Sequence, residues 1–444
     1  MQANRDAHEA LGKRFAELWR RESKPYALDW TLRRYESVVA RYDATVKRLA
    51  AIREATEDGE PLPAPGEVGL GIVELGVRRT RPHRVVQEPL APDAPWREPA
   101  ATHRIGLAIS AGKTDRHDLP IELDLRLPDD LAGSRTRVIR TDGKTPEDVL
   151  SQLRRTDKPG QARLTLLLRG ALARGKAATL EIYLGLPMDE PGPPPGAAHT
   201  RDAPKGAKWL ENDRLRLLLA PEGAHLYRWE VKALGDRDLT MPGRTSWFGF
   251  ADCGGIHRSA ENRLDCVAQG PALVRYRCTG EHGLVKTVSL WGGAAWVEVM
   301  TNSPLAYFWA LDNPRNFAAD GPTPGRYLFS TGASGAVGTQ ADGVAAQAKA
   351  RGAHWGVKFI PEKLALGMVT PEAKVTHVVA PGADAGGVGI EGGGTASHFV
   401  LYGGTLEGKP EDLMRRLQRT LDFRSPPEVT VYQMQVRKHD RDER

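Results

Sequence analysis

The feature that most constrains this chain is a long series of short alternating segments in its second half. Between Lys208 and about Gln435, apolar residues recur at every second position in segments such as "DRLRLLLAP", "LVKTVSLWG" and "AWVEVMTNS". Turn-forming residues separate these segments, and the clearest helix-length apolar stripe is "PEDLMRRLQRTLDF". A period of two residues is typical of β-strands with one buried face. The pattern predicts a large unit of two stacked antiparallel sheets over residues 208–437, rather than a parallel α/β sheet.

A smaller unit with the same periodicity is expected upstream, over residues 105–187. In "HDLPIELDLRLP", Ile121, Leu123 and Leu125 alternate with charged residues, and "ARLTLLLRG" and "ATLEIYLGLP" add further strands. We expect a small antiparallel β-sandwich with a structural role. The Pro/Gly-rich residues 188–207 are predicted to be a linker to the larger unit.

The N-terminal part of the chain has a different pattern. In residues 1–58, Leu11, Phe15 and Leu18 form one helical stripe, and a second stripe begins after Pro25. This predicts an antiparallel helical hairpin. The proline-rich residues 59–104 are predicted to be an extended connector that runs over the body of the protein. The complete fold prediction is therefore mainly β: a helical hairpin, a small β-sandwich and a large C-terminal β-supersandwich.

Composition excludes some classes of protein. The chain has 444 residues and a formal net charge of +6, and its arginines are scattered rather than clustered. Nucleic-acid binding is disfavoured, because there is no zinc-finger spacing and no long basic block. No apolar run reaches the ~18 residues that a membrane-spanning helix needs. The first residues contain no signal-peptide core, so we expect a secreted or periplasmic protein if a signal peptide was removed and a cytoplasmic one otherwise.

The three cysteines, Cys253, Cys266 and Cys278, lie close together in the sequence. Their spacing allows one disulfide with one thiol left over, or three small buried side chains. No CxxC pair occurs, which disfavours a structural zinc site. We identify no cofactor, and a Ca²⁺ site stays open because loop oxygen ligands have no fixed spacing.

One stretch of the larger unit resembles a known fold family. "WLENDRLRLLLAPEGAHLYRWEVKALGDRDLT" contains an alternating strand, a glycine-containing hairpin and a return strand that ends in "LGDRDL". It resembles the opening of galactose-mutarotase-like supersandwich domains, and the likeness extends over about residues 105–435. The resemblance implies a carbohydrate-active domain, as found in polysaccharide lyases, glycoside hydrolases and epimerases. The His/Glu constellation of the mutarotases is not matched position by position, so the resemblance supports the fold more strongly than one activity.

Three stretches of the larger unit concentrate the groups that carbohydrate sites need. Aromatic faces stack on sugar rings, and fixed polar groups bind the hydroxyls. "TSWFGFADCGGIHRSAEN" contains Trp247 and Asp252 before a Gly-Gly turn, with His257 and Arg258 after it. His257 could serve as a general base or a metal ligand there, with a solvent-facing loop histidine as the alternative.

The second stretch is "AYFWALDNPRNFAADGPTPG". Alternation places Tyr307 and Trp309 on one face of a strand and Phe308 on the other, so at least one of these aromatics packs in the core. The polar residues that follow exceed the needs of a simple turn. We expect a ligand-facing loop that contains Asp312, Asn313, Arg315 and Asn316.

The third stretch is "ARGAHWGVKF", with His354, Trp355 and Lys358. Its expected partner is "IEGGGTASHFVLYGG", which contains Glu391, His398 and Tyr402. A histidine in a strand more often packs than catalyses. The two segments gain functional meaning only if they converge on one face.

From these stretches we expect an enzyme that acts on a polysaccharide or oligosaccharide. The catalytic candidates are His257, Tyr307, Arg315, His354 and His398. The substrate-binding candidates are Trp247, Asp252, Arg258, Trp309, Asp312, Asn313, Asn316, Trp355, Lys358, Glu391 and Tyr402.

A Tyr/His/Arg set suits β-elimination from a uronic acid, in which a cation neutralises the carboxylate and a base removes the C5 proton. A glycoside hydrolase would instead use paired acids such as Asp252, Asp312 and Glu391. A sugar epimerase and a non-catalytic carbohydrate-binding protein are the remaining alternatives. The expected partner is a glycan, and the sequence leaves the sugar, its linkage and the oligomeric state open.

Overall fold

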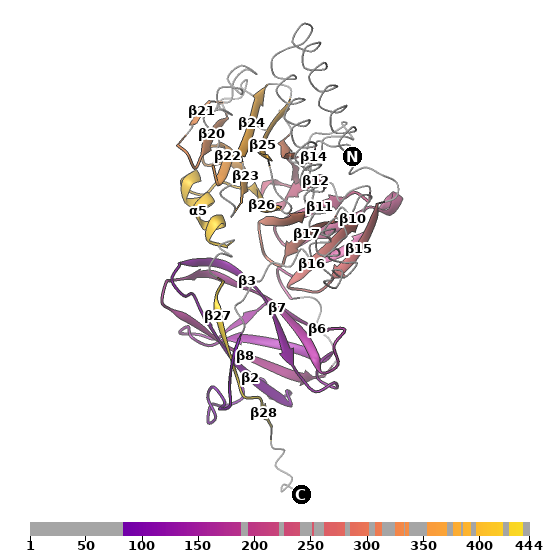
Figure 1. The fold of residues 1–444 in the computed structure, drawn as a ribbon, viewed down its shortest axis with the longest axis vertical. Coiled ribbons are helices and arrows are strands. Elements are labelled where there is room, and N and C mark those ends of the chain that lie inside the picture. The colour runs from indigo at the N-terminus through magenta and orange to yellow at the C-terminus, as the bar shows by residue number, and fades with distance from the viewer. Residues whose placement is uncertain are drawn as a thin grey trace, which may run out of the picture.

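A computed structural model describes much of the chain from residue 83 onward. The described residues are 83–187, 194–221, 226–239, 251–252, 262–279, 285–301, 307–312, 325–332, 334–336, 353–370, 376–382, 385–391, 397–420 and 426–437. They form five sheets, and apart from one parallel pair the described strands pair antiparallel (Figure 1). The predicted mainly-β class is confirmed. The expected helical hairpin, and the connector up to residue 82, lie outside the described residues.

The first body is a β-sandwich of two sheets. Its larger sheet has the order β1-β27-β2-β8-β4-β5, with β28 also paired to β2. These strands are β1 (Arg84–Val86), β2 (His103–Ser110), β4 (Arg135–Arg140), β5 (Glu147–Val149), β8 (Ala177–Leu186), β27 (Glu428–Tyr432) and β28 (Gln435–Val436). The second sheet contains β3 (Arg116–Arg126), β7 (Gln161–Leu172) and β6 (Ser151–Arg155).

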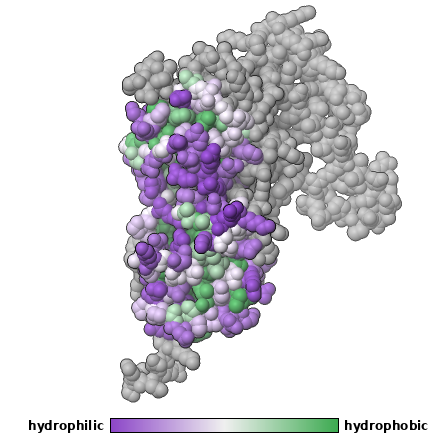
Figure 2. All heavy atoms as spheres, turned by 90° about the vertical axis from the view of Figure 1, so that its left-hand side faces the viewer, coloured by the Kyte–Doolittle hydropathy of each residue, from purple (hydrophilic) through white to green (hydrophobic). Residues whose placement is uncertain are grey.

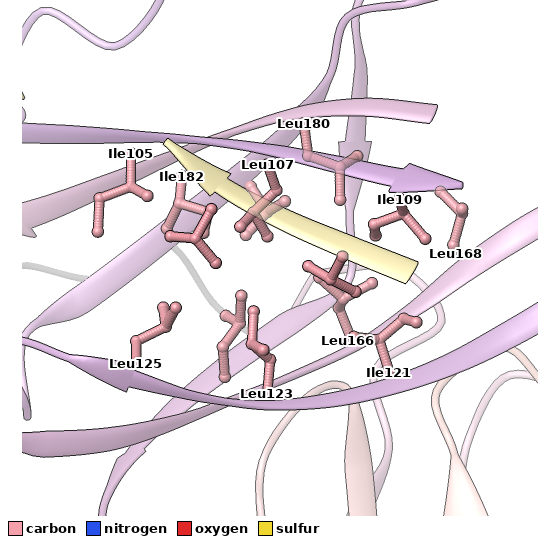
Figure 3. Close-up of a cluster of buried hydrophobic side chains, with 14 of the residues drawn as sticks. Ile105, Leu107, Ile109, Ile121, Leu123, Leu125, Leu166, Leu168, Leu180 and Ile182 are labelled. Atoms are coloured by element: carbon pink, nitrogen blue, oxygen red, sulfur yellow. The ribbon is translucent and has the colours of Figure 1, made fainter. Parts of the chain in front are cut away.

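Alternation explains the core of this first sandwich. Ile121, Leu123 and Leu125 of β3 point toward Leu107 and Ile182 of the facing sheet (Figure 3). The charged residues between them occupy the outer face of β3. Each apolar side chain removed from water contributes roughly 1.5 to 3 kcal/mol, so this face fixes the register of β3 against β7.

The second body is a larger sandwich. Its main sheet has nine strands in the order β15-β16-β17-β18-β26-β23-β22-β20-β21 among the described residues. They are β15 (Arg263–Ala268), β16 (Leu273–Thr279), β17 (Val285–Trp291), β18 (Trp296–Thr301), β26 (Ser397–Gly404), β23 (Leu364–Val369), β22 (Trp355–Ile360), β20 (Arg326–Phe329) and β21 (Ser334–Ala336).

A five-stranded sheet packs on the inner face of this main sheet. It contains β9 (His199–Asp202), β10 (Lys208–Glu211), β11 (Leu215–Leu219), β12 (Leu226–Val231) and β13 (Arg237–Asp238), with the short 3-10 helices η1 (Pro204–Gly206) and η2 (Lys232–Leu234). Leu217 and Trp229 of this sheet share one buried cluster with Val288, Val299 and Phe399 of the main sheet.

A four-stranded sheet lies beside β22 and β23. It contains β14 (Ala251–Asp252), β19 (Tyr307–Asp312), β25 (Ala385–Glu391) and β24 (Thr376–Gly382), in the order β14-β19-β25-β24. Strand β25 contacts both β22 and β23. The large unit therefore contains three of the described sheets.

The helix α5 (Pro410–Thr420) was expected from its apolar stripe. Proline begins it, two acidic residues occupy its first turn and Arg419 lies in its last turn, which suits the helix dipole. Leu413, Met414 and Leu417 pack on the outer face of the main sheet. Figure 2 shows hydrophilic residues over the region where α5 lies in Figure 1, with smaller hydrophobic patches above and below.

Two segments differ from the predicted grouping. Part of the expected linker, residues 188–207, forms β9, which pairs with β10. Strands β27 and β28 were expected in the large unit, but both pair with β2 of the first sandwich. Strand β27 also pairs in parallel with β1, so it fills a gap between two upstream strands. Among the described residues, no helix combines the length and apolar character that crossing a membrane requires.

Candidate functional site

Six of the predicted site residues lie outside the described residues, together with Cys253. They are Trp247, His257, Arg258, Asn313, Arg315 and Asn316. Their roles remain predictions. Of the other two cysteines, Cys266 is an exposed thiol and Cys278 is buried, and no disulfide joins these two described residues.

Five further candidates lie on strands of the four-stranded sheet, where only their backbone positions are described. Tyr307 lies directly opposite Glu391, which in turn lies opposite Thr376. On β14 and β19, Asp252 lies opposite Phe308. Trp309 and Asp312 lie further along β19. The register therefore brings the second and third predicted stretches together at Tyr307 and Glu391.

His354, Trp355 and Lys358 lie at or on β22. Trp355 packs in the apolar cluster on the outer face of the main sheet. Lys358 lies three residues later, so alternation places it on the inner face, opposite Leu366. The backbone of His354 accepts a hydrogen bond from Thr370 N and donates one to Ser330 Oγ at 2.7 Å.

The Nδ1 atom of His354 is buried, and it has no hydrogen-bond partner among the residues that the structure describes. Because side chains alternate along this segment, His354 and Lys358 do not lie on the outer face that holds Trp355. The third stretch is thus divided between the two faces of the sheet.

Tyr402 is buried in the same outer-face cluster as Trp355. Its hydroxyl donates a hydrogen bond to the backbone oxygen of Thr405 at 2.6 Å. Burial raises the pKa of Tyr402 to about 12, because a phenolate is poorly solvated there. Tyr402 is therefore a neutral hydrogen-bond donor at ordinary pH.

His398 forms the most distinctive polar contact in the described part of the main sheet. Its Nε2 lies 2.8 Å from Oε1 of Glu298, and Trp291 donates to the other carboxylate oxygen at 3.2 Å. The side chain of Glu298 is only 1% exposed and that of His398 is 9% exposed. A carboxylate accepts hydrogen bonds, so the imidazole donates through Nε2.

The strand register explains why these residues meet. Met300 of β18 lies opposite His398 of β26, and Glu298 is two residues before Met300. Glu298 and His398 therefore point to the same face as diagonal neighbours. Trp291 ends β17 on that face as well. The pair lies on the outer face of the sheet, opposite to the core shared with the five-stranded sheet.

A second ion pair lies in the adjacent row of this face. Arg275 lies opposite Ser289, and Ser289 lies opposite Glu298. Arg275 donates to both carboxylate oxygens of Glu122 at 2.9 Å and to Ser289 Oγ at 2.9 Å. Burial opposes the charge on Arg275, but Glu122 and Glu298 outweigh it and raise the pKa of the guanidinium.

Two further residues lie in the same cross-strand row as His398. Arg277 lies opposite Thr287, and Thr287 lies opposite Met300, so both belong to the row that contains His398. The hydroxyl of Thr287 is buried without a hydrogen-bond partner in the described part of the chain. Arg277 is exposed. The face therefore combines an imidazole hydrogen-bonded to a buried carboxylate with a solvent-facing cation.

Within the described ranges, no group of three or more His, Cys, Asp or Glu side chains is arranged to hold a metal ion.

The sequence prediction identified His398 but missed Glu298, Trp291, Arg275 and Glu122. One signal was available for Glu298. In "AWVEVMTNS" apolar residues flank Glu298 on both sides, as in a strand buried on both faces, so its carboxylate has to be buried. No local pattern indicates that its partner is a histidine one hundred residues later.

Comparisons with known proteins give only distant structural likenesses. No family model matches the sequence, and no curated protein matches it. A glycosyl hydrolase family 38 protein from Enterococcus faecalis matches 74% of this chain and 47% of its own length, with 11% identity and a TM-score of 0.40. An α-mannosidase from Enterococcus faecalis V583 matches 76% of this chain and 46% of its own length, with 11% identity and a TM-score of 0.40.

A galactose mutarotase-like protein from Lactobacillus casei ATCC 334 matches 45% of this chain and 99% of its own length, with 10% identity and a TM-score of 0.30. This chain spans about half the length of the two Enterococcus faecalis proteins, 47% and 46%.

Proposed function

We propose that this chain is a carbohydrate-active enzyme in which His398 transfers a proton and Glu298 orients it. The observation that carries the proposal is the hydrogen bond of 2.8 Å between His398 Nε2 and Glu298 Oε1. A base within hydrogen-bond reach of an orienting carboxylate is the arrangement expected for general acid–base catalysis.

The surroundings of Glu298 suit this role. Trp291 occupies the second carboxylate oxygen, so the carboxylate cannot rotate without losing a hydrogen bond. Its burial makes the interaction with the imidazole stronger than in water. Glu298 therefore fixes one tautomer of His398 and stabilises the imidazolium that forms when Nδ1 accepts a proton.

The substrate class is supported by the supersandwich-like sequence pattern and by the aromatic-rich stretches of the large unit. The leading form of the proposal is β-elimination from a uronic-acid-containing glycan. His398 would take the C5 proton, the electron pair of that C–H bond would form the C4–C5 double bond, and the C4–O bond would break. A second acid would return a proton to the leaving oxygen, and a cation such as Arg277 or Arg315 would neutralise the carboxylate.

A glycoside hydrolase is the weaker alternative. It needs two carboxyl groups that flank the scissile bond. Glu298 of this face and Glu122 of β3, which reaches it from the first sandwich, are both engaged by hydrogen bonds to cations or potential cations. One imidazole with one orienting carboxylate fits proton abstraction better.

The test is a screen of uronate-containing and neutral glycans with the whole protein. β-Elimination gives an ultraviolet absorbance from the unsaturated product, hydrolysis gives reducing ends alone, and a binding protein gives retention without product. For an active glycan, His398→Gln and Glu298→Gln are expected to lower kcat/KM by about 10² to 10⁴.

His199→Gln is the matched control. His199 also lies near a carboxylate, 3.6 Å from Glu211, but its side chain is 54% exposed on another sheet. It is expected to keep wild-type activity. A folded His398→Gln protein with full activity would exclude His398 as the proton-transfer group.

A further inference from the structure

The first sandwich contributes a charged side chain to the face that holds the His398–Glu298 pair. Glu122 lies on the outer side of β3, between Ile121 and Leu123 of the first core. Its two carboxylate oxygens accept hydrogen bonds from Arg275 of β16, each at 2.9 Å. Both side chains are mostly buried, with 14% and 15% exposed. This is a two-pronged ion pair between the two sandwiches.

Arg275 has a second carboxylate beside it. Ser289 separates Arg275 from Glu298 in one row of cross-strand neighbours, and its hydroxyl accepts a hydrogen bond from Arg275 Nε. The negative charge of Glu298 acts on the guanidinium. Arg275 is therefore placed between an acid that it binds, Glu122, and an acid that His398 binds, Glu298.

We propose that Glu122 is a positioning residue for the His398–Glu298 pair: it holds the Arg275 guanidinium and so leaves Glu298 bound to His398. The inference rests on the proposed function only for the chemical role of the pair, because the contacts themselves need no substrate. It makes the first sandwich a part of the site rather than a separate structural module.

The physical reason is competition for a buried cation. Removing one partner of a mostly buried ion pair is strongly unfavourable for the partner that remains, so the guanidinium turns to another nearby acceptor. Arginine binds a carboxylate more strongly than neutral imidazole does, because its hydrogen bonds are charge-assisted. Without Glu122, Arg275 is expected to take Glu298 from His398.

The described elements around His398 contribute several charges. Strand β15 contributes Asp265, which lies opposite Arg277, and α5 contributes Arg416, whose charge acts on Tyr402. Strand β18 contributes Glu298, β16 contributes Arg275 and Arg277, and β3 contributes Glu122. Arg277 is exposed to solvent and lies three cross-strand steps from His398, with Thr287 and Met300 between them. Arg275 is thus the described cation in the same cross-strand row as Glu298, with Ser289 between them.

The test follows the Nε2–H proton of His398 by NMR in the whole protein labelled with ¹⁵N-histidine. His398→Gln identifies the resonance, because that variant lacks it. In the wild type, the hydrogen bond to Glu298 protects this proton from exchange with solvent. Glu122→Gln is expected to speed its exchange by about tenfold or more, the loss that a hydrogen bond to a charged group implies.

A double-variant cycle tests whether Glu122 acts through Arg275. In Arg275→Met the competitor is absent, so the proton is expected to be protected at least as well as in the wild type. In the Arg275→Met background, adding Glu122→Gln is expected to change exchange by less than about twofold. Equal acceleration by Glu122→Gln in both backgrounds would overturn the proposal, as would an unchanged rate in the wild-type background.

Asp124→Asn is the matched control, since Asp124 lies two residues away on β3 and binds Arg163 through two hydrogen bonds at 2.7 and 3.0 Å. It is expected to leave the His398 resonance unchanged. If Glu122→Gln does not fold, Arg275→Met alone still decides the matter, because faster exchange in that variant contradicts a competing role for Arg275.

The two proposals can fail separately. The NMR measurement needs no glycan, so a protein without detectable turnover can still show the expected exchange rates. Turnover could depend on His398 while the exchange rate of its Nε2 proton stays the same in Glu122→Gln. That result would keep the proposed function and show that Glu122 is not part of the site.

Discussion

At the residue scale, two similar arginine–carboxylate ion pairs on β3 differ in their contribution to stability. Glu122 and Asp124 are two residues apart on β3, and each meets an arginine through two hydrogen bonds. The Arg163–Asp124 pair is exposed, with side-chain exposures of 41% and 46%, whereas the Arg275–Glu122 pair is closed between the sandwiches. An exposed pair contributes about 0 to 1 kcal/mol, while breaking a buried pair costs about 3 to 5 kcal/mol. Because the second body buries the Arg275–Glu122 pair, losing Glu122 is expected to cost more stability than losing Asp124.

A pH-dependent stability contribution is expected from Asp118 at the bulge of β3. Burial raises the pKa of its carboxyl, but hydrogen bonds from His117 and from Gly170 N outweigh burial and hold the pKa below its ordinary value of 3.8. A lowered pKa in the folded state stabilises the protein above about pH 3.8, and this stabilisation is lost as pH falls through the lowered value.

Asp118→Asn is therefore expected to lower the unfolding free energy at pH 7 by about 1 kcal/mol. Asparagine tolerates the left-handed backbone at this position, where φ is 45°, so strain is not added. Urea denaturation at decreasing pH should show the difference from wild type shrinking below pH 3.8. A difference that stays constant across this range would contradict the role given to the carboxylate.

At the element scale, α5 joins the two bodies. Leu413, Met414 and Leu417 pack on the main sheet, and Leu167 of the first sandwich belongs to the same cluster. At its C-terminal end, Thr420 donates a hydrogen bond to the backbone oxygen of His117 at 2.7 Å. The helix therefore packs against the face that also holds His398, and it fixes the first sandwich beside that face.

Met414→Ala is expected to lower the unfolding free energy by about 2 to 5 kcal/mol. Met414 is fully buried, so the substitution removes apolar contacts and leaves a cavity. Chemical denaturation measures the effect. Arg415→Ala on the same helix is the control, because its side chain is 63% exposed, and it should change stability by less than about 0.5 kcal/mol. Equal effects of the two substitutions would show that α5 does not pack as described.

At the scale of the whole molecule, a strand near the C-terminus pairs with the first described strands. Strand β27 lies between β1 and β2, and it buries Val429 and Val431 in the first core. The large unit is thus inserted between strands that belong to one sandwich. Because the two ends of the insertion meet in a single sheet, the first sandwich is complete only when the whole chain has folded.

A chain that ends after Thr420 is expected to lose about 3 kcal/mol or more, at roughly 1.5 kcal/mol or more for each buried valine. The expected result is a lower midpoint of thermal unfolding with earlier exposure of the first sandwich to protease. A chain that ends after Arg437, which keeps β27 and β28, is the control. An unchanged midpoint for the shorter chain would contradict the role of β27.

The sequence by itself determined the local conformation of the described elements. The alternation of Ile121, Leu123 and Leu125 predicted β3 and its buried side, and the apolar stripe after Pro410 predicted α5. Both patterns depend on neighbours within a few residues, which is the range over which side-chain periodicity acts. His398 was likewise among the candidates named from the sequence, although its strand context alone favoured packing.

Only the tertiary structure decided which strands lie side by side, and therefore which polar groups meet. Glu298 and His398 are one hundred residues apart, and Glu122 is 153 residues from Arg275. A register shift of one residue would turn either side chain to the opposite face, and no local pattern records that register across long connections. For the same reason, Lys358 and Trp355 were grouped by their nearness in sequence but lie on opposite faces of one sheet. Long-range strand pairing, set by the burial of both cores at once, gives the candidate site its composition.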